Sequence, residues 1–132
     1  MFDRARLETA AYAALRIVAG AMFTFHGTQK LFGVLATKAG PAVGSQMWIG
    51  GVIELVCGVL IAVGLFTRVA AFLASGMCAV AYLQFHWKGA LDGHLFPIVN
   101  KGELAVLYSF VFLFFAVRGA GAVSIDRHIG RA

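Results

Sequence analysis

A histidine, a lysine and a glutamate stand out in an otherwise apolar sequence, because together they could bind and protonate a small polar group. His26 and Lys30 are four residues apart, so they would share one face of a helix. Glu54 lies within the apolar run from Met47 to Phe66. Imidazole and ammonium groups donate hydrogen bonds to carbonyl oxygens, and a carboxylate can relay protons. These residues predict a site that recognises a small polar headgroup.

The position of Glu54 makes it the most informative of these residues. An ionised side chain within a lipid-immersed helix costs about 2.5–3.5 kcal/mol even on lenient scales, so such residues usually face a protein interior and mark function. Small residues at four-residue spacing on the same face would let another helix approach closely. A structural alternative is an ion pair of Glu54 with Lys30 or Arg16. The residues that share this helix face at four-residue spacing are Gly50, Glu54, Gly58 and Ala62.

Further polar residues fall near the same predicted end of the molecule. His86 ends the third apolar run, Asn100 lies in the loop that follows, and Glu103 opens the fourth run. Each histidine could instead be an interfacial side chain that only caps a helix or bonds to a loop. The predicted ligand-binding cluster comprises His26, Lys30, Glu54, His86, Asn100 and Glu103.

Arg16 and Arg68 are interpreted as structural charges. Arg16 interrupts the first apolar run, where it would reach the interface or pair across the bundle. Its presence also argues against cleavage of this run as a signal peptide, so we expect a retained helix. Arg68 falls in a tight turn predicted at Thr67-Arg68, between the second and third runs.

Neither a metal site nor a haem site is expected. His26 and His86 could ligate a haem iron from two sides, but they would lie at helix ends rather than in mid-bundle. A zinc site built from histidines and a glutamate has no supporting motif such as HxxxH or HExxH. Cys57 and Cys78 form no CxxC pair and lie in apolar runs, where a free cysteine usually behaves as a small hydrophobic residue.

The composition indicates that lipid is the main solvent of this chain. Hydrophobic residues make up 61% of the 132 residues and charged residues 13%, whereas a soluble domain is roughly half apolar and a quarter charged. The length predicts a single domain over residues 1–132. The net charge of +5 is spread in ones and twos along the sequence, which argues against nucleic-acid binding. The expected contacts are with membrane lipid instead.

Four apolar runs are long enough to cross a bilayer core about 30 Å thick at about 1.5 Å per residue. Backbone amides in lipid must be satisfied within the segment, so these runs must be helices. We therefore predict an all-α, multi-pass integral membrane protein, a four-helix bundle with up-down-up-down topology. The predicted spans are 10–32, 47–66, 69–87 and 103–117.

The basic residues predict the orientation of this bundle. In the four-span topology, six arginines fall on one side of the membrane and four lysines on the other. Cytoplasmic segments carry an excess of basic residues, so the larger group places both termini in the cytoplasm. The arginines are Arg4, Arg6, Arg68, Arg118, Arg127 and Arg131, and the lysines are Lys30, Lys38, Lys88 and Lys101.

Three segments of the chain resemble the DoxX family. The segment Leu15–Gly33 (LRIVAGAMFTFHGTQKLFG) resembles the opening signature of the family. The segment Gly51–His86 resembles its central glutamate helix, tight turn and third helix. The segment Asn100–Arg127 resembles its Asn-x-Gly-Glu motif and its closing Gly-x-Gly and Ser-x-Asp motifs. By position, the polar signature of the family falls on the six residues of the predicted cluster.

The resemblance implies a four-helix protein of the bacterial inner membrane, linked to quinone- and thiol-based redox chemistry, in a family with some members tied to oxidative-stress defence. The first hypothesis is a redox subunit that binds a quinone at the outer end of the bundle. The sequence shows no redox centre of its own, so a partner protein would supply the electrons. One alternative is a non-catalytic module that binds or transports a lipid or small molecule. Another is a structural membrane subunit whose polar network is fully satisfied.

Overall fold

The computed structural model describes residues 3–131, and all regular structure within this range is helical, as predicted. Four long helical segments alternate with loops and short helices. The third segment is an α-helix that continues directly into a π-helix, a wider helical form that is rare and recurs at functional sites. The long segments are α1 (Arg4–Phe32), α2 (Gln46–Val63), α3 (Thr67–Ala81) with η1 (Tyr82–Trp87), and α5 (Glu103–Arg118); the short ones are η2 (Gly93–Leu95), α4 (Pro97–Asn100) and α6 (Ile125–His128).

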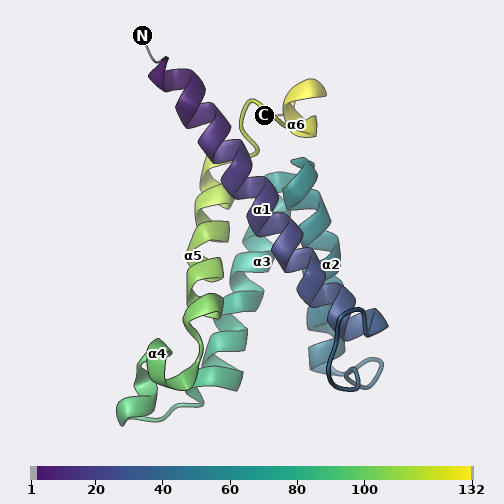
Figure 1. Cartoon of the computed structure of the whole chain (residues 1–132), viewed down its shortest axis with the longest axis vertical. Coiled ribbons are helices and arrows are strands. Elements are labelled where there is room, and N and C mark those ends of the chain that lie inside the picture. Colours follow the sequence, from purple (N-terminus) through teal and green to yellow (C-terminus); the bar gives the residue numbers. More distant parts are fainter. Residues whose placement is uncertain (1–2, 132) are drawn as a thin grey trace.

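The long helices associate as two pairs. α1 packs along α2, α3 packs along α5, and a smaller contact joins α2 to α3. The two pairs come together near the end that carries both chain termini, and they diverge toward the opposite end, where η1 and α4 lie (Figure 1). At the end away from the chain termini, α1 and α2 are therefore separated from α3 and α5.

Glycines bring α1 and α2 into direct backbone contact. A Cβ atom on Gly20 would lie 2.5 Å from the amide nitrogen of Ala62, and one on Gly27 would lie 2.5 Å from that of Leu55. Gly58 faces α1 in the same way, with a Cβ position 2.6 Å from the amide nitrogen of Thr24. No side chain larger than hydrogen fits at these separations. The predicted role of small residues in close helix packing therefore applies to Gly58.

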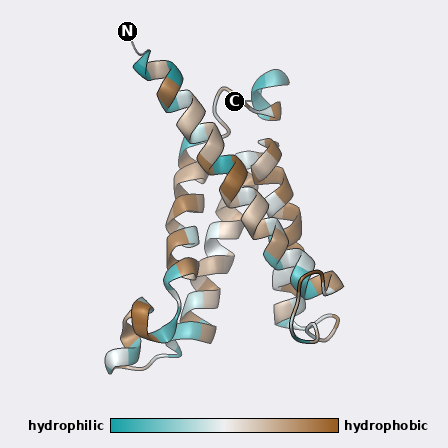
Figure 2. Ribbon diagram, viewed as in Figure 1, coloured by the Kyte–Doolittle hydropathy of each residue, from teal (hydrophilic) through white to brown (hydrophobic). Residues whose placement is uncertain are grey.

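Large apolar side chains lie on the outside of the helices as well as in the core. Phe72, Phe110 and Val117 are all more than 60% exposed, and hydrophobic residues recur along the whole length of the long helices (Figure 2). Within residues 3–131, two helices are long and apolar enough to cross a membrane, Gln46–Val63 and Thr67–Trp87. These outward-facing surfaces are typical of helices that contact lipid.

The turn between α2 and α3 differs from the prediction. It lies at 64–66 rather than at Thr67-Arg68, and Thr67 is already the first residue of α3. The reason is a distant cap: both carboxylate oxygens of Asp126 accept hydrogen bonds at 2.9 Å, one from the amide of Phe66 and one from that of Thr67. This interaction satisfies amides at the start of the helix that have no intrahelical partner.

Arg16 and Arg68 both donate hydrogen bonds to carbonyls at the ends of helices. Arg16 is fully buried, and its guanidinium lies 2.5 Å from the carbonyl oxygen of Ile61 and 2.6 Å from that of Val123. Arg68 donates to carbonyls at the end of α5, including that of Val117. Arg16 thus does not form the ion pair with Glu54 that the sequence left open.

Candidate functional site

An ion pair between α1 and α2 lies at the centre of the candidate site. The ammonium Nζ of Lys30 is 2.6 Å from Oε1 of Glu54, so of the two partners considered for this carboxylate the structure selects the lysine. The Glu54 residue is only 6% exposed. Its other oxygen, Oε2, is buried and has no hydrogen-bond partner among residues 3–131. A buried carboxylate oxygen without a partner is costly, which makes it a point where a ligand could bind.

A cavity of about 720 Å³ opens beside this ion pair, between the α1–α2 pair and the α3–α5 pair. Its walls are largely apolar. Four residues of the predicted cluster line it: His26, Lys30, Glu54 and His86. The other lining residues are Phe23, Gln46, Met47, Ile49, Gly50, Ile53, Phe72, Leu73, Gly76, Met77, Cys78, Val80, Ala81, Phe85, Lys101, Leu104, Ala105 and Tyr108.

Packed aromatic rings separate the cavity from the end of the molecule that carries the termini. Along α5 the lining stops at Tyr108. Phe112 and Phe115, one and two turns further on, are fully buried. The ring of Phe23 lies 4.7 Å from that of Phe112, centroid to centroid. Along α1 and α5, buried aromatic rings therefore close the cavity toward the terminal end.

Tyr108 is a candidate site residue that the sequence interpretation missed. Its hydroxyl is buried and lacks a hydrogen-bond partner within the described part of the chain. The ring stacks on Phe112 at 5.1 Å, and the ring of His26 meets it edge-on at 6.4 Å. The available signal was a hydroxyl on the apolar run from Glu103 to Val117, since a tyrosine hydroxyl in such a run must find a partner.

His86 reaches the cavity from the π-helix η1. Its Nδ1 lies 3.2 Å from the backbone carbonyl oxygen of Asn100. Because a carbonyl oxygen can only accept, Nδ1 is the donor in this hydrogen bond, and Nε2 is the ring nitrogen that the bond does not use. The ring stacks on Tyr82 at 6.4 Å. The π-helical turn changes the direction of the side chains relative to a continued α-helix, and two of its residues, Phe85 and His86, line the cavity.

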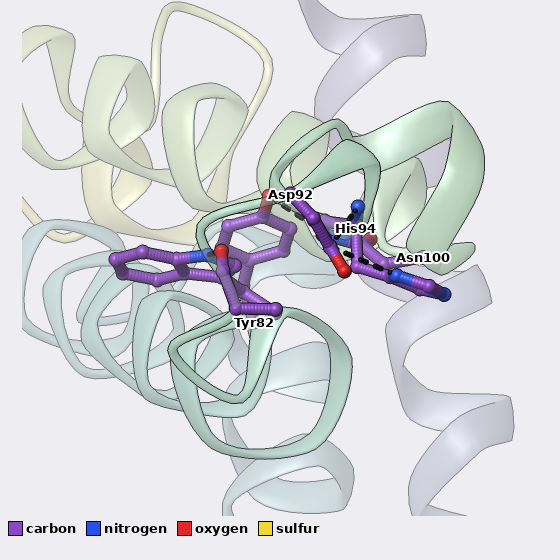
Figure 3. A network of polar contacts seen from close by, with 6 residues as sticks. Tyr82, Asp92, His94 and Asn100 are labelled. Atoms are coloured by element: carbon purple, nitrogen blue, oxygen red, sulfur yellow. Dashed lines mark hydrogen bonds and ion pairs between the residues drawn. The ribbon is translucent and has the colours of Figure 1, made fainter.

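Asn100 and Glu103 belong to the predicted cluster but do not line the cavity. Asn100, predicted in a loop, ends α4, and its side-chain amide donates to Tyr82 Oη at 3.2 Å and to the carbonyl of His94 at 2.9 Å (Figure 3). Glu103 is exposed at the start of α5. Asn100 therefore orders the loop that carries it, and its backbone carbonyl accepts the hydrogen bond from His86.

The same loop contains an exposed carboxylate and histidine pair. Asp92 Oδ1 accepts hydrogen bonds from the backbone N–H of His94 at 2.8 Å and, in the protonated ring or the appropriate tautomer, from its Nδ1 at 3.0 Å (Figure 3). These hydrogen bonds, the backbone one first, hold the pKa of Asp92 below its ordinary value. The pair closes the turn before η2 and lies outside the cavity.

Both cysteines are buried free thiols, and Cys78 lines the cavity whereas Cys57 does not. Across residues 3–131, no three histidine, cysteine, aspartate or glutamate side chains gather in a way that could hold a metal ion.

Comparison with known proteins supports the family resemblance. The DoxX family model matches residues 11–87 of the chain. A protein of Haemophilus influenzae, named only "Uncharacterized protein", is 49% identical over 118 residues, which cover 86% of this chain and 87% of that protein. No solved structure shows significant similarity. The matched region contains α2, α3 and most of α1, and so it includes His26, Lys30, Glu54 and His86.

Proposed function

The chain belongs to the DoxX family of membrane-associated proteins, and we propose that it is a multi-pass protein of the bacterial inner membrane whose cavity binds a quinone. In this proposal α2 and α3 with η1 cross the bilayer, and α1 and α5 accompany them as the other two spans. The bundle runs up-down-up-down with both termini in the cytoplasm. The arginine-rich composition of the terminal end supports this orientation.

The observation that carries the ligand proposal is a pair of buried polar atoms without partners in the described chain, Glu54 Oε2 and Tyr108 Oη. Both residues line the same apolar cavity. A carboxylate oxygen accepts a hydrogen bond and a phenol hydroxyl donates one. A quinone has carbonyl oxygens that accept, and its reduced form has hydroxyls that donate. A ring of this kind would satisfy both atoms and bury its apolar face against the walls.

The residues around the cavity would then divide the work of binding and proton transfer. Tyr108 and the imidazole of His26 would donate hydrogen bonds to a headgroup oxygen. Glu54 would accept or return a proton. The ammonium of Lys30 would stabilise the negative charge of the buried Glu54 carboxylate. When bound, a quinone supplies two-electron, two-proton redox chemistry. The electrons would come from a partner protein linked to thiol chemistry, as the family resemblance implies.

The alternatives fit this geometry less well. A structural subunit would be expected to satisfy its buried polar atoms internally. Within residues 3–131, four buried side-chain polar atoms lack a hydrogen-bond partner, and two of them, Glu54 Oε2 and Tyr108 Oη, line the same cavity. A transport path would be expected to continue to the terminal end, whereas Phe112 and Phe115, which lie toward that end on α5, are fully buried and do not line the cavity. Non-redox binding of an amphipathic molecule uses the same cavity, and experiment can separate it from quinone binding.

The direct test measures quinone binding by the purified chain in nanodiscs of a zwitterionic lipid. A short-chain benzoquinone is titrated against the wild type, Glu54→Gln and Tyr108→Phe, and molecules extracted from the gently purified protein are identified by mass spectrometry. We expect saturable binding that both variants weaken, together with co-purified quinone. Extraction of a different amphipathic molecule, with no benzoquinone binding, would favour the non-redox alternative. Unchanged binding by both variants would exclude this site.

A further inference from the structure

We propose that four arginines at the terminal end of the molecule form a binding site for the phosphate group of an anionic phospholipid. A second cavity, of about 240 Å³, lies at this end and is separate from the cavity beside Glu54. The loop 119–122 after α5 forms one wall. The ionisable residues that line it are Arg68, Arg118, Asp126, Arg127 and Arg131.

Among the described residues, no ion pair neutralises the arginines of this cavity. Within residues 3–131, no acidic side-chain oxygen lies within 4.0 Å of these four guanidinium groups. Asp126 contributes a carboxylate to the lining, but its two oxygens accept the amides of Phe66 and Thr67. Four cationic groups therefore face one carboxylate that is already hydrogen-bonded, and an anionic ligand would relieve their mutual repulsion.

Protein contacts hold three of the guanidinium groups in place while leaving hydrogen-bond donors available. The Arg118 guanidinium lies over the ring of Tyr12 at 4.3 Å, and that of Arg131 lies over the ring of Phe66 at 4.6 Å. A guanidinium stacked on a ring keeps its in-plane N–H groups for other partners. Arg68 donates to the last carbonyls of α5 through its terminal nitrogens, which leaves its Nε–H. Such preset donors suit the oxygens of a phosphate.

The Gly-x-Gly motif shapes the wall of the cavity, and the proposed function gives this motif no role. Gly119 and Gly121 have φ values of +86° and +78°, which disfavour other residues. A Cβ on Gly119 would lie 3.2 Å from Arg68 Nε, and a Cβ on Gly121 would lie 2.8 Å from the ring of Tyr12. The hydroxyl of Tyr12 also donates to the carbonyl of Gly119. The two glycines thus keep the loop close to the arginines that it encloses.

The surroundings of the cavity fit the headgroup of a lipid. Phe66, Val69 and Val117 expose apolar side chains at the same end of the helices. A phospholipid whose phosphate reached the arginines could lay its acyl chains along this surface. Juxtamembrane arginines on the cytoplasmic side are the residues that attract anionic headgroups. A free phosphate shares the same chemistry at the arginines, so the test must distinguish the two sources.

The test compares two double variants that remove the same charge from the same end of the molecule. Arg127→Gln/Arg131→Gln changes the cavity, whereas Arg4→Gln/Arg6→Gln changes exposed residues of α1 that do not line it. Each protein, in nanodiscs of phosphatidylcholine, is titrated with phosphatidylglycerol, and the retained lipid is counted by native mass spectrometry. Inorganic phosphate is titrated in parallel against the wild type. Thermal unfolding of each variant establishes that it is folded.

We expect saturable phosphatidylglycerol binding that falls at least tenfold in the cavity variant and less than twofold in the control. Inorganic phosphate should compete weakly if the lipid is the ligand. If inorganic phosphate bound the cavity at least as tightly as phosphatidylglycerol, the arginines would still be a phosphate site, but the ligand would be a soluble phosphate rather than a lipid. Equal loss in both variants would show non-specific charge attraction and overturn the proposal, as would unchanged binding in a folded cavity variant.

Discussion

The ammonium of Lys30 lies 2.6 Å from one carboxylate oxygen of Glu54, and the second oxygen of the same carboxylate is buried without a partner in the described chain. The pair is therefore only half satisfied by the protein. Lys30 neutralises the charge of Glu54, and the cavity beside it offers room for a donor to the remaining oxygen. This asymmetry is the basis of the proposed ligand site, because a purely structural ion pair would be expected to satisfy both oxygens.

Replacing Lys30 by Met should destabilise the protein because it leaves the Glu54 carboxylate buried without a counter-charge. Removal of one member of a fully buried pair costs about 3–5 kcal/mol. The Lys30 side chain is 31% exposed, so we expect a smaller loss of roughly 2–3 kcal/mol in the free energy of unfolding. The double variant Lys30→Met/Glu54→Gln should recover most of this loss. Thermal unfolding in detergent measures both, and equal instability of the single and double variants would contradict the prediction.

Tyr108→Phe should leave stability nearly unchanged and weaken ligand binding. The change removes only a hydroxyl that has no protein partner among residues 3–131. A hydrogen bond to a ligand contributes about 1 kcal/mol, which corresponds to an approximately fivefold change in dissociation constant. Titration of a short-chain benzoquinone against the wild type and Tyr108→Phe measures this change in dissociation constant.

Tyr12→Phe is the matched control for that variant, since it removes a hydroxyl that donates to the carbonyl of Gly119. It should lower the free energy of unfolding by about 1 kcal/mol and leave benzoquinone binding unchanged. If Tyr108→Phe were the more destabilising of the two, its hydroxyl would have a structural partner and the prediction would be wrong.

The sequence predicted the all-helical fold and the inward direction of Glu54 because both follow from local rules. The hydrophobic runs require helices, and four-residue spacing places Gly58 and Glu54 on one face, where both are buried. The same spacing placed Lys30 beside His26, and both line the cavity. Local periodicity was therefore enough to find one side of the site.

The rest of the site depends on contacts between distant segments that no local pattern encodes. The angle between the two helix pairs decides that Tyr108 faces the cavity while Glu103, on the same helix, is exposed. Arg16 finds carbonyls 45 and 107 residues away. The carboxylate of Asp126, 59 residues away in the sequence, caps the start of α3 at Thr67. Periodicity identifies the face of a helix, but not the partner or the crossing angle.

Asp126 should make stability sensitive to acid. Burial alone would raise its pKa, but hydrogen bonds from the amides of Thr67 and Phe66, with the charge of Arg131, outweigh this and hold the pKa below the ordinary 3.8. A carboxyl with a lowered folded-state pKa stabilises the fold above pH 3.8, and this contribution disappears as the pH falls through the lowered value. The midpoint of thermal unfolding should therefore decrease in this range.

Asp126→Asn should show a smaller decrease over the same pH range, because its side chain does not titrate. Glu8→Gln, which alters an exposed carboxylate of α1, is the control and should keep the wild-type slope. At pH 7 the Asn variant should be less stable by about 1 kcal/mol, since it replaces a charged cap by a neutral one. An identical pH slope in Asp126→Asn and wild type would show that the acid sensitivity arises elsewhere.

Gly20→Ala and Gly76→Ala should have opposite effects, although both replace a helical glycine by alanine. A Cβ on Gly20 would lie 2.5 Å from the amide nitrogen of Ala62 and 2.7 Å from the carbonyl oxygen of Gly58, and neither backbone atom can move without separating α1 from α2. We expect a loss of about 2–3 kcal/mol in the free energy of unfolding. Apart from the adjoining backbone of its own helix, no atom of the described chain lies within 4 Å of a Cβ on Gly76, so alanine there should raise stability by up to about 1 kcal/mol through helix propensity.

Gly76→Leu extends this contrast from packing to function, since Gly76 lines the cavity beside Glu54. The leucine side chain should enter open space and leave the fold intact, while it occupies volume that a ligand needs. We expect a wild-type midpoint of thermal unfolding together with at least a tenfold loss of benzoquinone binding. Ala116→Leu, on a partly buried position that does not line the cavity, tests whether added bulk alone has this effect. Benzoquinone binding that survives in a folded Gly76→Leu protein would place the ligand outside the cavity.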